Sequence, residues 1–416
     1  MKKLFTLLFL CISHISFASE VCQDDSKALL KELLLNHPSI KMSQEVIKGS
    51  KQRIDSAYWE FFPTPSVDVS AKDGDRYTTV ARLEQPLWTG GKLTSGYDIA
   101  QSKEQESINQ LRESSFKLMD NYFNILEKYF KAKMNIKELN KGLQNLTELE
   151  QMLQRRIDSG ISSNSDSELL KARIQQIQAD LIVAQNSYTI ATMQLELLFD
   201  KKISCDISLH RVNILHSKNI QDSIDRLLSF HPSLGLLDST IQTAKYELEN
   251  KKASVMPTLS LRGEYRKGDL YDENYNRDSN NQSIVYIAFS ANTQAGLSAL
   301  SNIEEARIKI NELKFKKQTV KKELIDTLLN DYNNYEIAKN RIKVLKASID
   351  SSRNVLDSYK RLFIAGKKQW LNLVDASKEL MNYNIQLANT ISNRDILAYK
   401  LALKNGQIDL LSGEIR

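Results

Sequence analysis

The chain has 416 residues, among them 14 glycines and 6 prolines, and its formal net charge at pH 7 is +6. So few glycines and prolines exclude a protein of many short elements, and the stretches rich in Leu, Ile, Lys, Glu and Ala favour long helices. The weak positive charge is spread along the chain, so nucleic acid is not expected as a partner. The sequence has no nucleophile triad, metal-ligand cluster or phosphate loop, so we expect neither an enzyme nor a metal ion or other cofactor.

The first 18 residues have the pattern of a secretory signal peptide. Lys2 and Lys3 precede an apolar run, and Ser16-Phe17-Ala18 stands after it, before Ser19. No other stretch has about 18 consecutive apolar residues, so no transmembrane helix is expected. Two cysteines remain after the signal peptide, Cys22 and Cys205. In an oxidising compartment they form either a disulfide or two free thiols, and the sequence leaves both possibilities open.

The first half of the exported chain predicts a helix at residues 38–59, strands at 66–73 and 77–88, and long helices at 97–159 and 165–200. Apolar residues in the first long helix alternate by four and three, a heptad-like seam that requires a helical partner. The members of this seam are Leu118, Tyr122, Ile125, Tyr129, Ala132, Ile136, Leu139, Leu143 and Leu146. At about 1.5 Å per residue this helix is roughly 90–100 Å long, so we expect the two shorter helices to lie end to end beside it.

The same order of elements occurs a second time. His37-Pro38 returns as His231-Pro232, and Pro63-Thr64 returns as Pro257-Thr258, each 194 residues later. The duplication divides the chain into repeats at 19–210 and 211–416. The second repeat predicts a helix at 232–254, strands at 258–267 and 282–292, and long helices at 298–364 and 370–404. The two histidines suggest a metal pair only superficially, and we interpret them as landmarks of the repeat.

Each predicted strand alternates apolar and polar residues, so the sheet has one apolar face and one polar face. The charged residues assigned to the polar face are Asp68, Arg82, Glu84, Arg262 and Glu264. A soluble sheet shows this pattern with its core on the apolar side, and a membrane barrel shows it with lipid outside and water inside. Because a barrel needs about eight strands, four strands require several chains to close one.

Three segments, together with the duplication, resemble the TolC family of trimeric outer-membrane channels. They are residues 83–92 (LEQPLWTGGK), 257–261 (PTLSL) and 366–376 (GKKQWLNLVDA). Residues 295–300 and Trp370 are similar to the LapE-like branch, which serves type I secretion of large adhesins. The resemblance implies a mainly α chain with membrane β-strands, in which a helix–β-hairpin–long helical hairpin unit is duplicated. Three copies would form a 12-stranded β-barrel continued by a periplasmic α-helical barrel.

The resemblance also implies partners and a passive role. The homotrimer would sit in outer-membrane lipid and dock to a periplasmic adaptor and an inner-membrane ABC transporter, conducting substrate without catalysing a reaction. A small-molecule (drug or metal) efflux channel with an RND-type pump has the same fold and is the alternative. A periplasmic coiled-coil adaptor or scaffold explains the helices but not the two pairs of amphipathic strands.

Candidate site residues follow from the same resemblance. The two aspartates that ring the closed pore in the family fall on Asn372 and Asp375, and a basic residue that holds the closed state falls on Lys368. The aromatic before the turn falls on Phe363, where a tyrosine is expected. Because one carboxylate is missing, we expect packing of Trp370, Leu371 and Leu373 to contribute to the constriction. Without the family, Asp375 reads as an ordinary solvated residue.

The turns of the two long hairpins are the expected adaptor-docking tips, because exposed turns are suited to recognition. Simple turn chemistry explains their glycines equally well. The residues assigned to these tips are Gly160, Ile161, Ser162, Gly366 and Lys367.

Overall fold

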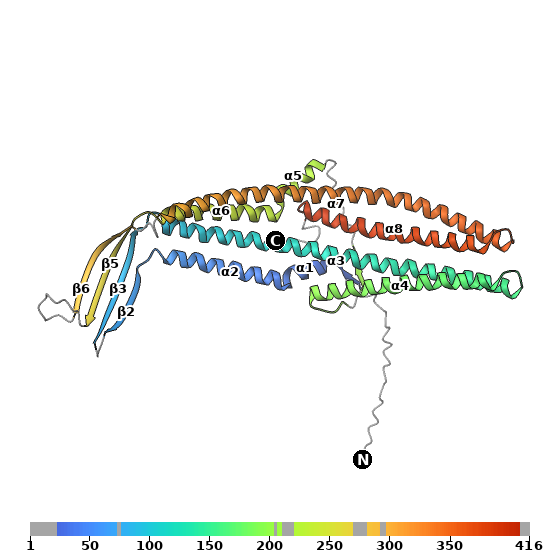
Figure 1. Ribbon diagram of the computed structural model, residues 1–416, viewed down its shortest axis with the longest axis horizontal. Coiled ribbons are helices and arrows are strands. Elements are labelled where there is room, and N and C mark those ends of the chain that lie inside the picture. Colours follow the sequence, from blue (N-terminus) through green and yellow to red (C-terminus); the bar gives the residue numbers. More distant parts are fainter. Residues whose placement is uncertain are drawn as a thin grey trace, which may run out of the picture.

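A computed structural model of the protein describes residues 23–72, 76–203, 206–209, 220–268, 281–291 and 297–407. The expected signal peptide and both cysteines of the possible disulfide lie outside these residues. The described part is a long rod (Figure 1). A four-stranded sheet lies at one end, and the two turns that connect the long helices lie at the other. Of the helices described, none has the length and apolar character needed to span a membrane.

The elements of the first repeat differ little from the predicted ones. They are β1 (Gln23–Asp25), α1 (Ser26–Asn36), α2 (Pro38–Trp59), β2 (Thr64–Lys72), β3 (Arg76–Trp88), α3 (Lys92–Asp158) and α4 (Asn164–Phe199). α3 begins at Lys92 rather than at residue 97. Gly90 and Gly91 adopt positive φ angles of 61° and 91°, which complete the turn after β3 and allow the helix to begin directly.

The second repeat has the same sequence of elements. They are β4 (Asp206–Ser208), α5 (Ile220–Phe230), α6 (Pro232–Ala253), β5 (Thr258–Gly268), β6 (Asn281–Ser290), α7 (Ser298–Ile364) and α8 (Trp370–Lys404). The short elements β1, α1, β4 and α5 were not predicted. They lie near the middle of the rod, where β1 pairs with β4 in parallel and aligns Gln23 with Asp206.

The helices form one layer in which α3 and α7, of 67 residues each, run the full length. α2 and α4 follow one another along α3, and α6 and α8 follow one another along α7 (Figure 1). This confirms the predicted end-to-end arrangement of the shorter helices. α6 and α8 also contact α3, so the order across the layer is α2–α3–α6–α7 near the sheet and α4–α3–α8–α7 near the turns.

Two large apolar cores and two smaller apolar clusters hold the described part of the layer together. The middle core surrounds Tyr122, Phe123 and Tyr129 of α3 and includes α1 and the C-terminal part of α8. The Tyr122 hydroxyl donates a hydrogen bond of 3.0 Å to the Ser26 carbonyl, which fixes α1 against α3. The second core begins at Leu139 and extends to the turns. The heptad-like seam of α3 therefore serves both cores, as its spacing indicates.

The four long strands form a single antiparallel sheet in the order β2-β3-β5-β6. The hairpins of the two repeats meet between β3 and β5, where Arg82 is the register partner of Glu264. β2 and β6 are the edges of this sheet, and within the described part of the chain each has one side without a strand partner. The sheet is therefore open.

Candidate functional site

The polar face of the sheet carries a continuous ion-pair network. All five residues assigned to this face lie on it, as the strand register shows. Arg82 Nε donates to Glu264 Oε1 at 2.8 Å, and the Nη1 of the same guanidinium lies 3.4 Å from Asp68 Oδ2. Arg262 Nη2 lies 2.9 Å from Glu84 Oε1. The pairs Arg82–Glu264 and Arg262–Glu84 both connect the two repeats.

Two residues missed by the sequence analysis complete this network. Arg266 Nη2 lies 2.8 Å from Glu264 Oε2, and the Tyr286 hydroxyl donates to Glu264 Oε1 at 3.0 Å. The Glu264 side chain is only 3% exposed although the face is open. Continuing the period-two alternation from Glu264 to Arg266 would have identified the first of them.

The opposite face of the sheet is apolar and uncovered. Val67 is 67% exposed, Val285 73% and Phe289 69%. The soluble alternative requires a core on this side of the sheet, and the exposure of these side chains contradicts it. An apolar sheet face without protein covering it fits contact with lipid.

The two turns at the other end of the rod have the same backbone geometry. Gly160 and Gly366 take φ angles of 74° and 72°, and each follows the last turn of a long helix. The next amides bond back to the helix: Ile161 N–H donates to the Arg156 carbonyl at 2.8 Å, and Lys367 N–H to the Leu362 carbonyl at 2.9 Å. These are glycine C-caps. Of the tip residues, Gly160, Ile161, Gly366 and Lys367 are exposed and Ser162 is half-buried.

The residues assigned to the pore constriction lie along this end of α7 and α8 but are not all surface groups. Asp375 is exposed, Asn372 and Lys368 are half-buried, and Phe363 is buried. Lys368 Nζ lies 4.4 Å from the centre of the Tyr359 ring, a cation–π contact within its own hairpin. Trp370 and Leu373 are buried in the second core, so they pack inside one chain.

A further residue, Arg156 of α3, joins the two hairpins at their turns. Its Nη1 donates a 2.9 Å hydrogen bond to the Phe363 carbonyl, and its guanidinium carbon lies 4.7 Å from the centre of the Phe363 ring. α3 and α7 are separated by α8 along most of this half of the layer. Arg156 thus links directly two helices that both pack on a third, α8. The sequence analysis missed it because a basic residue in the last helical turn is explained by the helix dipole.

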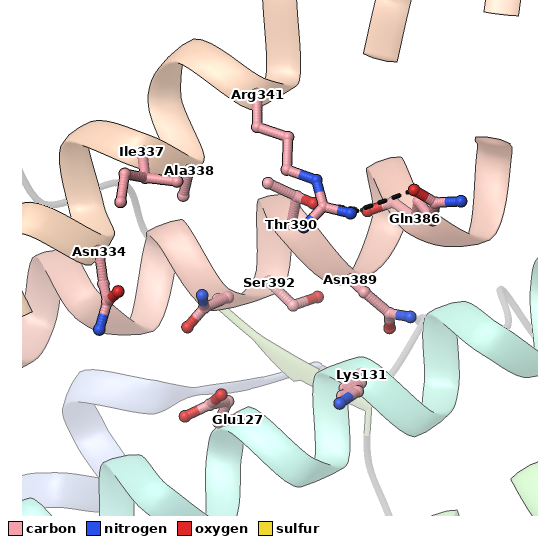
Figure 2. Close-up of a pocket in the computed structure, with 11 residues that line it drawn as sticks. Glu127, Lys131, Asn334, Ile337, Ala338, Arg341, Gln386, Asn389, Thr390 and Ser392 are labelled. Atoms are coloured by element: carbon pink, nitrogen blue, oxygen red, sulfur yellow. Dashed lines mark hydrogen bonds between the residues drawn. The ribbon is translucent and has the colours of Figure 1, made fainter. Parts of the chain in front are cut away.

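A polar hollow of about 410 Å³ separates the two apolar cores (Figure 2). It is lined by side chains of α3, α7 and α8, among them Lys131, Arg341 and Asn389. Arg341 Nη2 donates to Gln386 Oε1 at 3.1 Å across its rim, and the buried Oδ1 of Asn389 has no hydrogen-bond partner. The hairpin of α7 and α8 therefore leaves a space against α3 at this level.

The two repeat histidines each cap a helix. The Nδ1 of His37 accepts from the Ser39 amide at 3.2 Å, and that of His231 accepts from the Ser233 amide at 3.3 Å. Burial and, to a lesser extent, the nearby charge of Lys404 lower the pKa of His231 to about 4, so it is neutral at pH 7.

The family model described as outer membrane efflux protein matches residues 29–199 and 223–403, which lie in the two repeats. The chain belongs to the outer membrane efflux protein family. This membership confirms the resemblance to TolC-family channels and places the protein in the outer membrane, with its helical part in the periplasm. It also agrees with the expectation that the chain is not an enzyme.

Individual relatives support the family and the fold. The alkaline protease secretion protein AprF of Pseudomonas aeruginosa is 23% identical over 319 residues, which are 74% of this chain and 65% of AprF. The match therefore spans slightly less than two thirds of that relative. The fold is similar to CusC, with a TM-score of 0.78, 14% identity and 91% of each chain covered. It is also similar to VceC from Vibrio cholerae, with a TM-score of 0.77, 15% identity and coverage of 94% of this chain and 97% of that one.

Proposed function

We propose that three copies of this chain form a passive outer-membrane channel of a tripartite export system. The observation that carries the proposal is the sheet: its apolar face is exposed, its polar face holds an ion-pair network, and neither edge strand has a second strand partner among the described residues. Three such sheets joined edge to edge make a 12-stranded barrel, a number sufficient for closure. The apolar face then meets lipid, and the charged face lines a wet lumen.

The helical layer supports the same assembly. Its two outer edges are α4 on one side and α7 on the other. Each edge carries exposed apolar residues separated by seven positions or by about a multiple of seven, which is the spacing of a coiled-coil seam. On α4 these are Leu169, Val183, Ile190 and Leu197, and on α7 they are Ile308, Phe315, Ile337 and Val344. The α7 edge of one copy packing on the α2 and α4 edge of the next continues the layer into a tube.

Asp375 is the residue proposed to face the narrow end of the tube, with Asn372 beside it. Three carboxylates attract cations, although more weakly than a ring of six would. The experiment is conductance of the purified protein in planar bilayers. We expect cation-selective channels, and we expect Asp375→Ala to reduce the selectivity while Glu168→Ala on α4 leaves it unchanged. A protein that stays monomeric in mild detergent and forms no channels overturns the proposal.

For the cargo we propose a protein exported by type I secretion, such as a large adhesin, delivered through a periplasmic adaptor and an ABC transporter. Support comes from the LapE-like segments and from AprF, whose name records secretion of alkaline protease. The test is deletion of the gene followed by analysis of the culture medium and of drug and metal tolerance. Loss of a large secreted protein with unchanged tolerance supports this cargo. Unchanged secretion with lost tolerance favours small-molecule efflux and an RND-type pump.

A further inference from the structure

The helices of the two repeats correspond residue by residue. α3 and α7 have 67 residues each, and their first residues, Lys92 and Ser298, are 206 positions apart (298 − 92). α2 and α6 have 22 residues each and begin 194 positions apart (232 − 38). α4 and α8 begin 206 positions apart, at Asn164 and Trp370 (370 − 164). Each position in a helix of the first repeat therefore has one equivalent in the second.

Contacts inside the chain follow this correspondence. Ser50 Oγ of α2 lies 2.8 Å from Ser107 Oγ of α3. The equivalents of these residues are Ala244 of α6 and Leu313 of α7, which belong to one apolar cluster. The contact of α2 with α3 is thus used again between α6 and α7. By the same rule, the contacts of α3 with α6 and α8 indicate how α7 would meet α2 and α4 of another copy.

The contact of α3 with α6 is polar and buried, whereas the equivalent surfaces are apolar and open. Ser102 Oγ lies 2.8 Å from Thr243 Oγ1, and these residues are 8% and 4% exposed. Their equivalents are Ile308 of α7, which is 59% exposed, and Gly49 of α2. A Cβ added to Gly49 would meet no atom within 4 Å. Two polar side chains of medium size are therefore replaced by one large apolar side chain and an empty position that can receive it.

The contact of α3 with α8 shows the same change of chemistry at the polar hollow. Lys131 of α3 and Asn389 of α8 line the hollow from its two sides (Figure 2). Their equivalents are Ile337 of α7 and Val183 of α4, which are 61% and 67% exposed. Where the chain leaves a polar space between its own helices, its two free edges thus carry apolar side chains.

A third pair is apolar in both places and supports the same alignment. The ring centres of Phe123 of α3 and Tyr399 of α8 are 5.3 Å apart, and both residues are buried in the middle core. Their equivalents, Leu329 of α7 and Met193 of α4, are 36% and 61% exposed. Positions that are covered inside the chain are therefore uncovered at its edges.

Single apolar residues are common on protein surfaces and need no explanation. The exposed residues of these pairs are different, because each is equivalent to one that meets a partner inside the chain. Ile308 also points to the free edge of the layer. It lies two residues, or about 200° of helix, from Ile310, which is buried in the cluster with α6.

The polar contacts inside the chain oppose a wrong arrangement, in which α7 of one copy replaces α3 of another against α6. Thr243 would lose its hydrogen bond with Ser102. Phe315 would take the place of Asn109, whose side-chain nitrogen donates to the Gly235 carbonyl at 3.1 Å. Because buried polar groups without partners are costly, this exchange is unfavourable.

We propose that the apolar edges recognise a second copy of this chain in the alignment set by the repeat, with Ile308 over Gly49 and Ile337 against Val183. The polar counterparts of these residues inside the chain keep the two repeats from exchanging partners between copies. The proposal rests on the three-copy channel proposed above and adds the alignment of the copies and its physical cause.

Disulfide trapping tests the alignment, with both native cysteines replaced by Ser. The Gly49→Cys/Ile308→Cys variant should give covalently linked copies on denaturing gels without reductant. The Ser102→Cys/Thr243→Cys variant is the matched control. It should link within one chain and run as a single chain, because the two native oxygens lie 2.8 Å apart. The Thr243→Cys/Ile308→Cys variant reports exchange, and we expect it to link no copies.

A second experiment keeps the native cysteines and gives the edges the chemistry of the hollow. Ile337→Lys/Val183→Asn changes two side chains that are exposed in the single chain, so we expect unchanged circular dichroism. The association constant of the copies should fall by at least about tenfold, since two apolar side chains no longer become buried. Ile161→Asn is the control, because Ile161 is 63% exposed and its equivalent, Lys367, is exposed as well.

The outcomes separate this inference from the channel itself. If the unmodified protein forms three-copy assemblies but Gly49→Cys/Ile308→Cys links none of them, the alignment is wrong while the channel stands. Unchanged association of the Ile337→Lys/Val183→Asn variant would overturn the role of the apolar edges, and links between copies of the Thr243→Cys variant would overturn the role of the polar counterparts. An unmodified protein that stays monomeric in mild detergent contradicts the proposed channel.

Discussion

A few side chains decide how the two hairpins are held, and Arg156 is the most specific of them. Its hydrogen bond goes to the main-chain carbonyl of Phe363, and only its cation–π contact depends on the ring. The link therefore tolerates a phenylalanine where the family has a tyrosine. In the proposed channel it holds the tip of the second hairpin to the first.

Arg156→Ala removes both contacts, so we expect the tip of α7 to separate more readily from α3 and the single-channel conductance to rise. Arg156→Lys keeps the charge but loses the planar group that satisfies both contacts, and an intermediate conductance is expected. The neighbouring Arg155, which is exposed, supplies the control: Arg155→Ala should behave like the unmodified protein. Equal conductance of the Arg156 and Arg155 variants would contradict the role of the link.

His231 predicts a dependence of stability on pH. Its pKa falls from 6.5 to about 4 on folding, chiefly because it is buried. The folded chain protonates His231 less readily than the unfolded chain does. The neutral ring therefore contributes its full stabilisation of the folded state above pH 6.5, and this stabilisation is lost as the pH falls towards 4. A shift of this size corresponds to about 3 kcal/mol per chain. Glu113 and Lys404 are the charged groups that act on this ring.

His231→Asn keeps a good N-cap for α6 but cannot titrate. We expect the variant to lose much of the drop in unfolding temperature between pH 7 and pH 4.5. His37→Asn in the first repeat is the matched control, because His37 is less buried, and a smaller change is expected. Thermal unfolding in detergent at the two pH values measures both. An unchanged pH dependence of the His231 variant would show that other groups dominate it.

At the scale of elements, the structure joins rigid and loosely packed sections. The sheet and the middle core are tied to α3, whereas the polar hollow at the level of Lys131 and Asn389 interrupts the packing of α7 and α8 on α3. Beyond it, the second core and Arg156 hold the tips. A bend of the layer at the hollow would break few apolar contacts, so we expect any movement of the tip half relative to the rest to be favoured at this level.

The exposed turns predict a docking surface that is separable from the assembly. Ile161 is 63% exposed at the first tip and contributes to neither described core. We expect Ile161→Asp to abolish export of the cargo protein while the trimer and its conductance persist. Ile182→Asp, on the exposed flank of α4, controls for loss of apolar surface as such. If the Ile161 variant exports normally, the first tip is not part of the adaptor contact.

Periodicity predicted the long elements, because a heptad-like seam over α3 and alternation over β2, β3, β5 and β6 are repeated signals. The five charged residues of the polar face followed from the same alternation. α1, α5, β1 and β4 were missed because they are short and owe their positions to contacts such as that of Tyr122 with Ser26. Arg156 was missed for a related reason: its partner is a main-chain carbonyl 207 residues away, which no sequence pattern marks.

On the scale of the whole molecule, the pairing of β1 with β4 brings residues 23–25, which follow the expected signal peptide, next to residues 206–208. Gln23, which follows Cys22, is aligned with Asp206, which follows Cys205. We therefore expect the exported protein to contain the Cys22–Cys205 disulfide. Alkylation without reductant should modify neither cysteine, and after reduction it should modify both. Labelling of both thiols in the unreduced protein would contradict the bond.

The open sheet has a consequence for biogenesis. A single chain cannot complete the hydrogen bonds of β2 and β6, and bilayer lipid offers no substitute for them. Insertion of one subunit at a time is therefore unfavourable, and in the proposed trimer we expect the strands to enter the membrane only when three chains close the ring together. Until then each newly exported chain carries an unpaired apolar sheet through an aqueous compartment. The rate of maturation should accordingly depend steeply on subunit concentration and on factors that keep such edges apart.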